Sequence, residues 1–112
     1  MEISEYQFNQ GLGIKIGGRL DASNSGEFEA KLIELYNSGA DNILFDVSEL
    51  DYISSAGLRV FMLAWNSCNE HDKRIALLQA NDIVAEVFEI SGLSDLIPAV
   101  ASIEAAIEYF NE

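Results

Sequence analysis

Segments with the apolar pattern of β-strands alternate with segments that have the apolar spacing of α-helices along the whole chain. The strand-like segments either alternate apolar and polar residues with a period of two or form short continuous apolar runs. They cover residues 6–8, 12–16, 42–47, 75–78 and 96–100. This order of elements predicts an α/β fold in which parallel strands are joined by helical crossovers.

Four segments between and after these strands place apolar residues three or four positions apart, as amphipathic helices do. Each follows a polar residue that can cap a helix N-terminus. The candidates are the run ASNSG at 22–26, Ser54 or Ser55, Asn81 or Asp82, and Ser102. Gly39 and Gly92 predict the ends of the first and third helices. No linker interrupts the pattern, so we expect one domain over residues 1–112, with a mixed, largely parallel central sheet of four or five strands packed by about four helices.

Charge and composition narrow the classes of partner. The 112 residues include 19 acidic side chains against 6 Lys and Arg, a formal net charge of −13. A chain with this negative charge is repelled by nucleic acid and by anionic lipid surfaces, so we expect no nucleic-acid binding and no direct membrane insertion. A basic protein surface is the natural partner. The first ten residues do not resemble a leader peptide, and no apolar run approaches the roughly 18 residues of a membrane span, which predicts a cytoplasmic protein.

Residue types that carry catalysis or metal binding are few and far apart. Cys68 is the only cysteine and His71 the only histidine, so the sequence offers no internal disulfide and no zinc-type cluster. His71 lies at the far end of the helix that begins near Ser55, roughly 20 Å away at about 1.5 Å per residue, which argues against a Ser–His pair. We therefore predict no catalytic residue, no metal and no cofactor.

The segment 46–60 joins a buried strand to a helix through two adjacent hydroxyls, Ser54 and Ser55. Only one serine is needed to cap the helix. The other can point outward, where free N–H groups and the positive end of the helix dipole favour an added phosphate. Gly57, in the first turn, is expected to leave the backbone approachable, and Asp46 is expected to fix the preceding loop by accepting hydrogen bonds.

Several motifs occur in this chain in a characteristic order. They are GRLD at 18–21, Asp46 and Leu50, ISSAGL at 53–58, and FEISGL at 88–93. Together they resemble the motifs of bacterial anti-sigma factor antagonists, single-domain members of the STAS group, over nearly the whole chain. The family's Asp-Ser-small-Gly-Leu motif falls on 54–58, with Ser54 at the place of the usual aspartate. The resemblance implies a STAS domain that is a regulatory binding protein and not an enzyme.

The resemblance also implies a partner switch. The unmodified protein would bind an anti-sigma factor serine kinase, so that the sigma factor is released. Phosphorylation of Ser55 by that kinase would end the binding, and a serine phosphatase would restore it. The residues expected to form the partner-binding surface lie in the loop before the first helix and around the phosphorylation site: Asp21, Ser54, Ala56, Gly57, Leu58 and Arg59.

Two alternatives stay open. Arg59, one helical turn after Ser55, either meets the phosphate through i,i+4 geometry or is an ordinary solvated arginine. At the level of function, the chain is alternatively a constitutive, non-phosphorylated STAS subunit of a transport complex or of another signalling complex. In that case a phosphomimetic substitution leaves its assembly unchanged.

Overall fold

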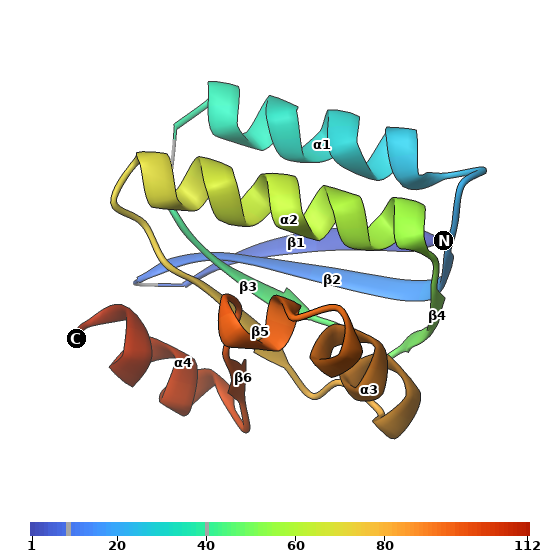
Figure 1. Ribbon diagram of the computed structural model, residues 1–112. Coiled ribbons are helices and arrows are strands. Elements are labelled where there is room, and N and C mark those ends of the chain that lie inside the picture. Colours follow the sequence, from blue (N-terminus) through green and yellow to red (C-terminus); the bar gives the residue numbers. More distant parts are fainter. Residues whose placement is uncertain (9, 40) are drawn as a thin grey trace.

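The computed structural model describes residues 1–8, 10–39 and 41–112 and shows a central β-sheet with helices on both faces (Figure 1). Five strands follow the order β1-β2-β3-β5-β6, and β4 pairs with β2 off this path. β1 is antiparallel to β2, whereas all the other recorded strand pairs are parallel. The predicted mixed, largely parallel sheet is confirmed.

Strands and helices follow one another as the sequence pattern predicts. The strands are β1 (Glu2–Phe8), β2 (Gly11–Leu20), β3 (Asn42–Asp46), β4 (Leu50–Ile53), β5 (Ile75–Leu78) and β6 (Ala99–Val100). The helices are α1 (Ser25–Asn37), α2 (Ser55–Glu70), α3 (Asp82–Ile90), the short 3-10 helix η1 (Leu93–Asp95) and α4 (Ile103–Phe110). In the described residues the sheet thus has six strands rather than four or five, because β4 lies in the connection between β3 and α2.

Two hydrophobic cores lie on opposite faces of the sheet. Helices α1 and α2 pack side by side on one face, and α4 covers part of the other (Figure 1). In β3, Ile43 and Phe45 face the first core while Leu44 between them faces the second. Because successive side chains of a strand point to opposite faces, a strand buried on both reads as a continuous apolar run. This explains the unbroken apolar run ILF at residues 43–45.

Four phenylalanines connect the helices to the sheet at the centre of the larger core. The ring of Phe61 from α2 lies 4.8 Å from that of Phe45 in β3, 5.4 Å from Phe28 in α1 and 5.2 Å from Phe88 in α3, measured between centroids. Aromatic pairs of this kind add about 0.5–1.5 kcal/mol each beyond the area they bury. They hold α2 in place between α1 and α3, and thereby fix where α2 begins.

The predicted helix starts are confirmed, with one difference in detail. Ser54, Asn81 and Ser102 each accept a hydrogen bond from the backbone N–H three residues later, over 3.3, 2.9 and 3.1 Å. Asn24 stands at the start of α1, but its side-chain oxygen accepts from the N–H of Asp21 instead. The first helix therefore begins without a side-chain cap, and its asparagine orders the loop that precedes it.

Candidate functional site

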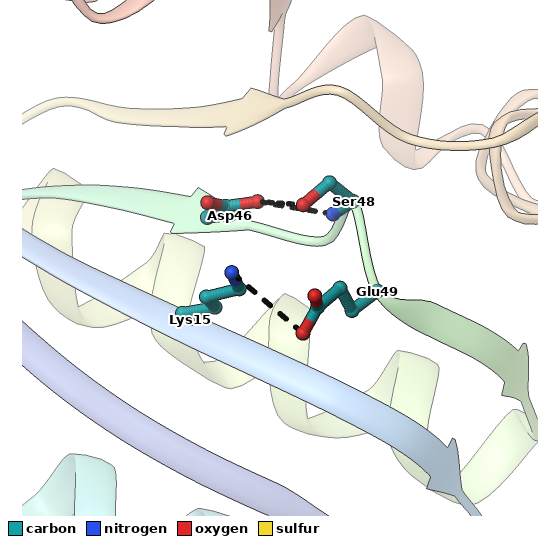
Figure 2. A network of polar contacts seen from close by, with 4 residues as sticks. All are labelled: Lys15, Asp46, Ser48 and Glu49. Atoms are coloured by element: carbon teal, nitrogen blue, oxygen red, sulfur yellow. Dashed lines mark hydrogen bonds and ion pairs between the residues drawn. The ribbon is translucent and has the colours of Figure 1, made fainter.

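The loop between β3 and β4 is held by polar contacts at both of its ends (Figure 2). Asp46 accepts the backbone N–H of Ser48 over 3.0 Å and its hydroxyl over 2.7 Å. Lys15 of β2 lies 3.6 Å from the carboxylate of Glu49. The expected role of Asp46 as a loop-fixing acceptor is confirmed, and the turn that it closes leads the chain directly into β4.

Strand β4 brings the phosphorylation-site candidates next to the end of β2. It pairs with Gly18–Leu20 of β2, and the backbone N–H of Ser54 donates to the carbonyl of Leu20 over 2.9 Å. Asp21 follows Leu20 immediately. The sheet therefore places the loop before α1 beside the start of α2, although Asp21 and Ser54 lie more than thirty residues apart in sequence. The structure thus brings together two segments that the sequence analysis assigned to the partner-binding surface.

The two adjacent serines have different environments. Ser54 is half-buried, and its hydroxyl oxygen caps α2 by accepting the N–H of Gly57. Ser55 is the first residue of α2 and is exposed. At this position the unpaired N–H groups of the first turn and the positive end of the helix dipole lie close to any group attached to the Ser55 oxygen. One serine thus serves the fold and leaves the other accessible.

Gly57 has a packing role that differs from the expected one. It is buried, and a β-carbon at this position would lie 2.8 Å from Cγ of Leu20 and 3.0 Å from Cγ1 of Ile53. The first turn of α2 therefore approaches β2 and β4 closely only because Gly57 has no side chain. Its backbone is covered rather than open to a partner, whereas Ala56 and Leu58 on either side are half-buried.

Asp21 is held in its charged form by its own loop. Its carboxylate accepts the hydroxyl of Ser23 over 2.5 Å and the N–H of Ser23 over 3.0 Å, and these hydrogen bonds lower the pKa of Asp21. The Asn24 amide donates to the carbonyl of Arg19 over 2.9 Å, so the loop is tied to the end of β2. Beside Ser54 the surface therefore presents a fixed negative charge.

Arg19 and Tyr52 belong to this region, and the sequence analysis missed both. They are paired in the β2–β4 register, and the Arg19 guanidinium carbon lies 4.2 Å from the centre of the Tyr52 ring, within the range of a cation–π contact. Tyr52 is 39% exposed. A large aromatic in the polar segment just before the two serines was the signal in the sequence, but only the sheet pairing identifies its neighbour.

Arg59 is 71% exposed at its side chain and lies 3.6 Å from the carboxylate of Glu29 in α1. An ion pair that is this open to solvent contributes little to stability. Arg59 therefore has a partner in Glu29, but the ion pair between them is weak. It remains within one helical turn of Ser55 on α2.

Cys68 and His71 lie towards the opposite end of α2, where Cys68 is buried and His71 is exposed. Cys68 is fully buried beside the hydroxyl of Tyr36, and burial raises the pKa of its thiol to about 11. The His71 ring nitrogen Nδ1 lies 2.8 Å from the carbonyl of Ser67 at the end of the helix. Among the residues that the structure describes, no three His, Cys, Asp or Glu side chains are grouped to hold a metal ion. None of the described helices has the length and apolar character needed to cross a membrane.

Sequence relatives share most of the chain. The family model described as "Mlab, STAS domain" matches residues 6–98. A candidate anti-sigma factor antagonist of Bordetella bronchiseptica, BtrV, is 37% identical over 93 residues, 83% of this chain and 80% of its own. The anti-sigma-B factor antagonist of Staphylococcus aureus is 32% identical over 83 residues, 74% of this chain and 77% of its own. These names describe regulatory binding proteins, so the prediction of a non-enzymatic protein is confirmed.

Solved structures share the fold. A candidate anti-sigma factor antagonist of Thermotoga maritima superposes with a TM-score of 0.91 at 19% identity, over 98% of this chain and 95% of the other. The anti-sigma factor antagonist SpoIIAA in its unphosphorylated form gives a TM-score of 0.84 at 22% identity, over 98% and 96%. Bacillus SpoIIAA in its phosphorylated form gives 0.74 at 22% identity, over 96% and 98%. By its family model, its relatives and its fold, the chain belongs to the STAS-domain family of anti-sigma factor antagonists.

Proposed function

We propose that this chain binds an anti-sigma factor serine kinase while Ser55 carries a free hydroxyl, and that phosphorylation of Ser55 by this kinase ends the binding. A serine phosphatase then restores it. The proposal is carried by one observation: Ser55 is exposed at the first position of α2, beside a second serine that already caps the helix. The names of the relatives support an anti-sigma factor as the partner, and the kinase activity of this partner is part of the proposal.

In the transfer, the chain contributes only the acceptor oxygen. Oγ of Ser55 bonds to the γ-phosphorus of ATP as the bond between this phosphorus and the β–γ bridging oxygen breaks. The hydroxyl proton passes to a base of the kinase, and ADP leaves. The product phosphate stands at the start of a helix of 16 residues, where backbone N–H groups and the helix dipole stabilise an anion. The fold therefore survives the modification.

The same phosphate is unfavourable inside an interface. It adds about 1.5 to 2 negative charges near neutral pH, and a partner that covers Ser55 would have to remove its hydration shell. The proposed contact surface consists of Asp21, Ser54, Ala56, Leu58 and Arg59, and the Arg19–Tyr52 pair extends it along β2 and β4. Binding is lost through steric overlap and repulsion at this surface.

The charge of the chain suits a basic partner. A formal net charge of −13 and the fixed carboxylate of Asp21 favour encounter with a positively charged kinase surface, and such an encounter slows as salt is raised. We further propose that residues 1–112 act as one STAS domain and that the protein works in the cytoplasm.

The test compares phosphorylation and binding in matched variants. The wild-type chain, Ser55→Ala and Ser54→Ala are incubated with the cognate kinase and ATP, and the site of modification is located by mass spectrometry. We expect phosphate on wild type and Ser54→Ala and none on Ser55→Ala. In pull-downs with the kinase, we expect Ser55→Asp to lose binding by about 100-fold or more, because a fixed charge is left in a desolvated interface.

The control is Ser94→Asp, which adds the same charge at an exposed position of η1. It should bind like wild type. Phosphate on Ser54 instead of Ser55 would show that the assignment of the acceptor is wrong. Full binding by Ser55→Asp would support the alternative, in which the chain is a constitutive STAS subunit that phosphorylation does not regulate.

A further inference from the structure

Helices α1 and α2 leave a groove between them on the side away from the sheet. They lie side by side on one face (Figure 1), and the groove has a volume of about 470 Å³. Leu32, Val60 and Ala64 belong to the buried core beneath it, whereas Ile33 and Leu63 are more exposed. The small side chains of Ala64 and Ser67 in α2 leave room for apolar groups from another molecule.

One apolar residue of the groove is exposed without a reason in the fold. Ile33 of α1 is 52% exposed, whereas Phe28 and Leu32 of the same helix are buried. Its β-branched side chain lies on the same helix face as Glu29 and Tyr36, which also line the groove. A partner that covered Ile33 would gain the hydrophobic stabilisation that the isolated chain leaves unused.

The charges along the groove have one sign. Its charged lining residues are Glu29, in the second turn of α1, and Glu70, the last residue of α2. Glu29 has a partner in Arg59, but that contact is long and solvent-exposed. From Val60 to Glu70 the groove runs along about 15 Å of α2, or three turns of a helix lying beside it. These features define what fits: an apolar ridge of three turns with cations at its two ends.

We propose that the α1–α2 groove docks an amphipathic helix of a partner protein, with a Leu- or Ile-rich seam on Ile33 and Leu63 and with Lys or Arg residues facing Glu29 and Glu70. This is a helix-in-groove contact. The groove is lined by other residues than the Ser55 surface, although the two surfaces meet at the Glu29–Arg59 ion pair. The proposal goes beyond the proposed switch and does not require phosphorylation of Ser55. A second copy of this chain is a poor occupant, because two grooves with acidic ends and a formal net charge of −13 each repel one another.

The test uses the full chain and two designed peptides of about 16 residues, long enough to form a helix. Both peptides carry Leu on one face; one has Lys beside the ends of the leucine seam and the other has Glu at the same places. Binding is measured by fluorescence anisotropy near physiological salt. We expect the Lys peptide to bind wild type at least about tenfold more tightly than the Glu peptide.

The substitution Ile33→Glu should weaken the binding of the Lys peptide by about tenfold or more, because it places a charge in the apolar seam. The matched control is Ile83→Glu, which makes the same substitution at an isoleucine of α3 that is 63% exposed and does not line the groove. It should leave the affinity unchanged within about twofold. Thermal unfolding of both variants verifies that they are folded.

NMR titration of wild type with the Lys peptide gives a second readout that does not depend on any variant. We expect the largest amide shifts along the facing sides of α1 and α2. Absence of saturable binding, equal weakening by Ile33→Glu and Ile83→Glu, or shifts confined to other elements would overturn the proposal. So would a dimer of this chain that Ile33→Glu dissociates, because the occupant would then be a second copy.

Discussion

The two ends of helix α2 carry potential nucleophiles in opposite environments. At the N-terminal end, Ser55 is exposed at the helix start and the neighbouring loops are polar. Towards the C-terminal end, Cys68 is fully buried against Tyr36, and its pKa is raised to about 11. A thiol is the stronger nucleophile only as a thiolate, so burial removes the advantage of Cys68. Burial, rather than side-chain type, decides which of these two groups is accessible to a reagent.

The largest effect that would break this comparison is reactivity at Cys68. At about pH 8, we expect iodoacetamide to alkylate Cys68 in the native protein at least about 100-fold more slowly than in the denatured chain, because the raised pKa lowers the thiolate fraction and burial blocks access. Mass spectrometry at timed intervals measures both rates. Rates that agree within about threefold would show that the C-terminal end of α2 is open.

The same pKa shift predicts a direction for stability against pH. The thiol of Cys68 has a pKa of about 11 in the fold and 9.0 ordinarily, so between these values the unfolded chain loses its proton first. Its contribution to the free energy of unfolding is fully present below about pH 9 and is lost as the pH rises towards 11. Burial also raises the pKa of Tyr36, which acts in the same direction. Chemical denaturation at each pH, with Cys68→Ala as the control, should show a shallower decline in the variant.

Gly57 and Gly26 each lie in the first turn of a helix, but only Gly57 is closely packed against other elements. A β-carbon at Gly57 meets Leu20 at 2.8 Å, whereas nothing lies within 4 Å of one at Gly26 in the first turn of α1. We expect Gly57→Ala to lower the free energy of unfolding by about 1–3 kcal/mol through overpacking. Gly26→Ala should leave it unchanged or raise it by up to about 1 kcal/mol, because alanine favours the helix. Urea denaturation measures both, and equal stability of the two variants would contradict the close approach of α2 to β2.

The smallest expected effect is a difference in stability between variants of Ser54 and of Ser55. Ser54→Ala removes the cap of α2 and should lower the free energy of unfolding by about 0.5–1 kcal/mol, towards the low end of the usual range since the hydrogen bond is long at 3.3 Å. Ser55→Ala should change it by less than about 0.5 kcal/mol, as expected for an exposed side chain. Ser54→Asp should keep the cap. If Ser55→Ala were the more destabilising variant, Ser55 rather than Ser54 would be the capping residue.

Local patterns predicted most elements because the interactions behind them are local. The spacing of apolar residues predicted α2 and α3, and the cap candidates Asn81 and Ser102 accept the hydrogen bonds that their positions suggested. The sequence analysis missed β4 for a physical reason. This strand has only four residues and its two central residues are exposed, so it contains no apolar run that a sequence pattern could reveal. Asn24 was one of the cap candidates in the run 22–26, but its side chain orders the preceding loop instead of capping α1.

In the candidate site, too, some features were visible in the sequence and others only in the structure. The serine pair at a strand-to-helix junction was visible in the sequence, and so was the idea that one serine caps and the other is free. The sequence did not show which serine is covered, that Gly57 is buried against Leu20, or that Arg19 lies over Tyr52. Each of these depends on the pairing of β4 with β2, which joins residues about thirty positions apart.

By itself, the amino-acid sequence determined the order of strands and helices, the acidity of the chain and the motif that holds the phosphoacceptor candidate. These follow from hydrophobic periodicity, capping and residue type, which act over a few neighbouring residues. Only the tertiary structure decided which loops meet at Ser55, why Cys68 is inaccessible and where a groove opens between α1 and α2. Those features arise from contacts between distant segments, and burial and side-chain contact are set only when the segments pack together.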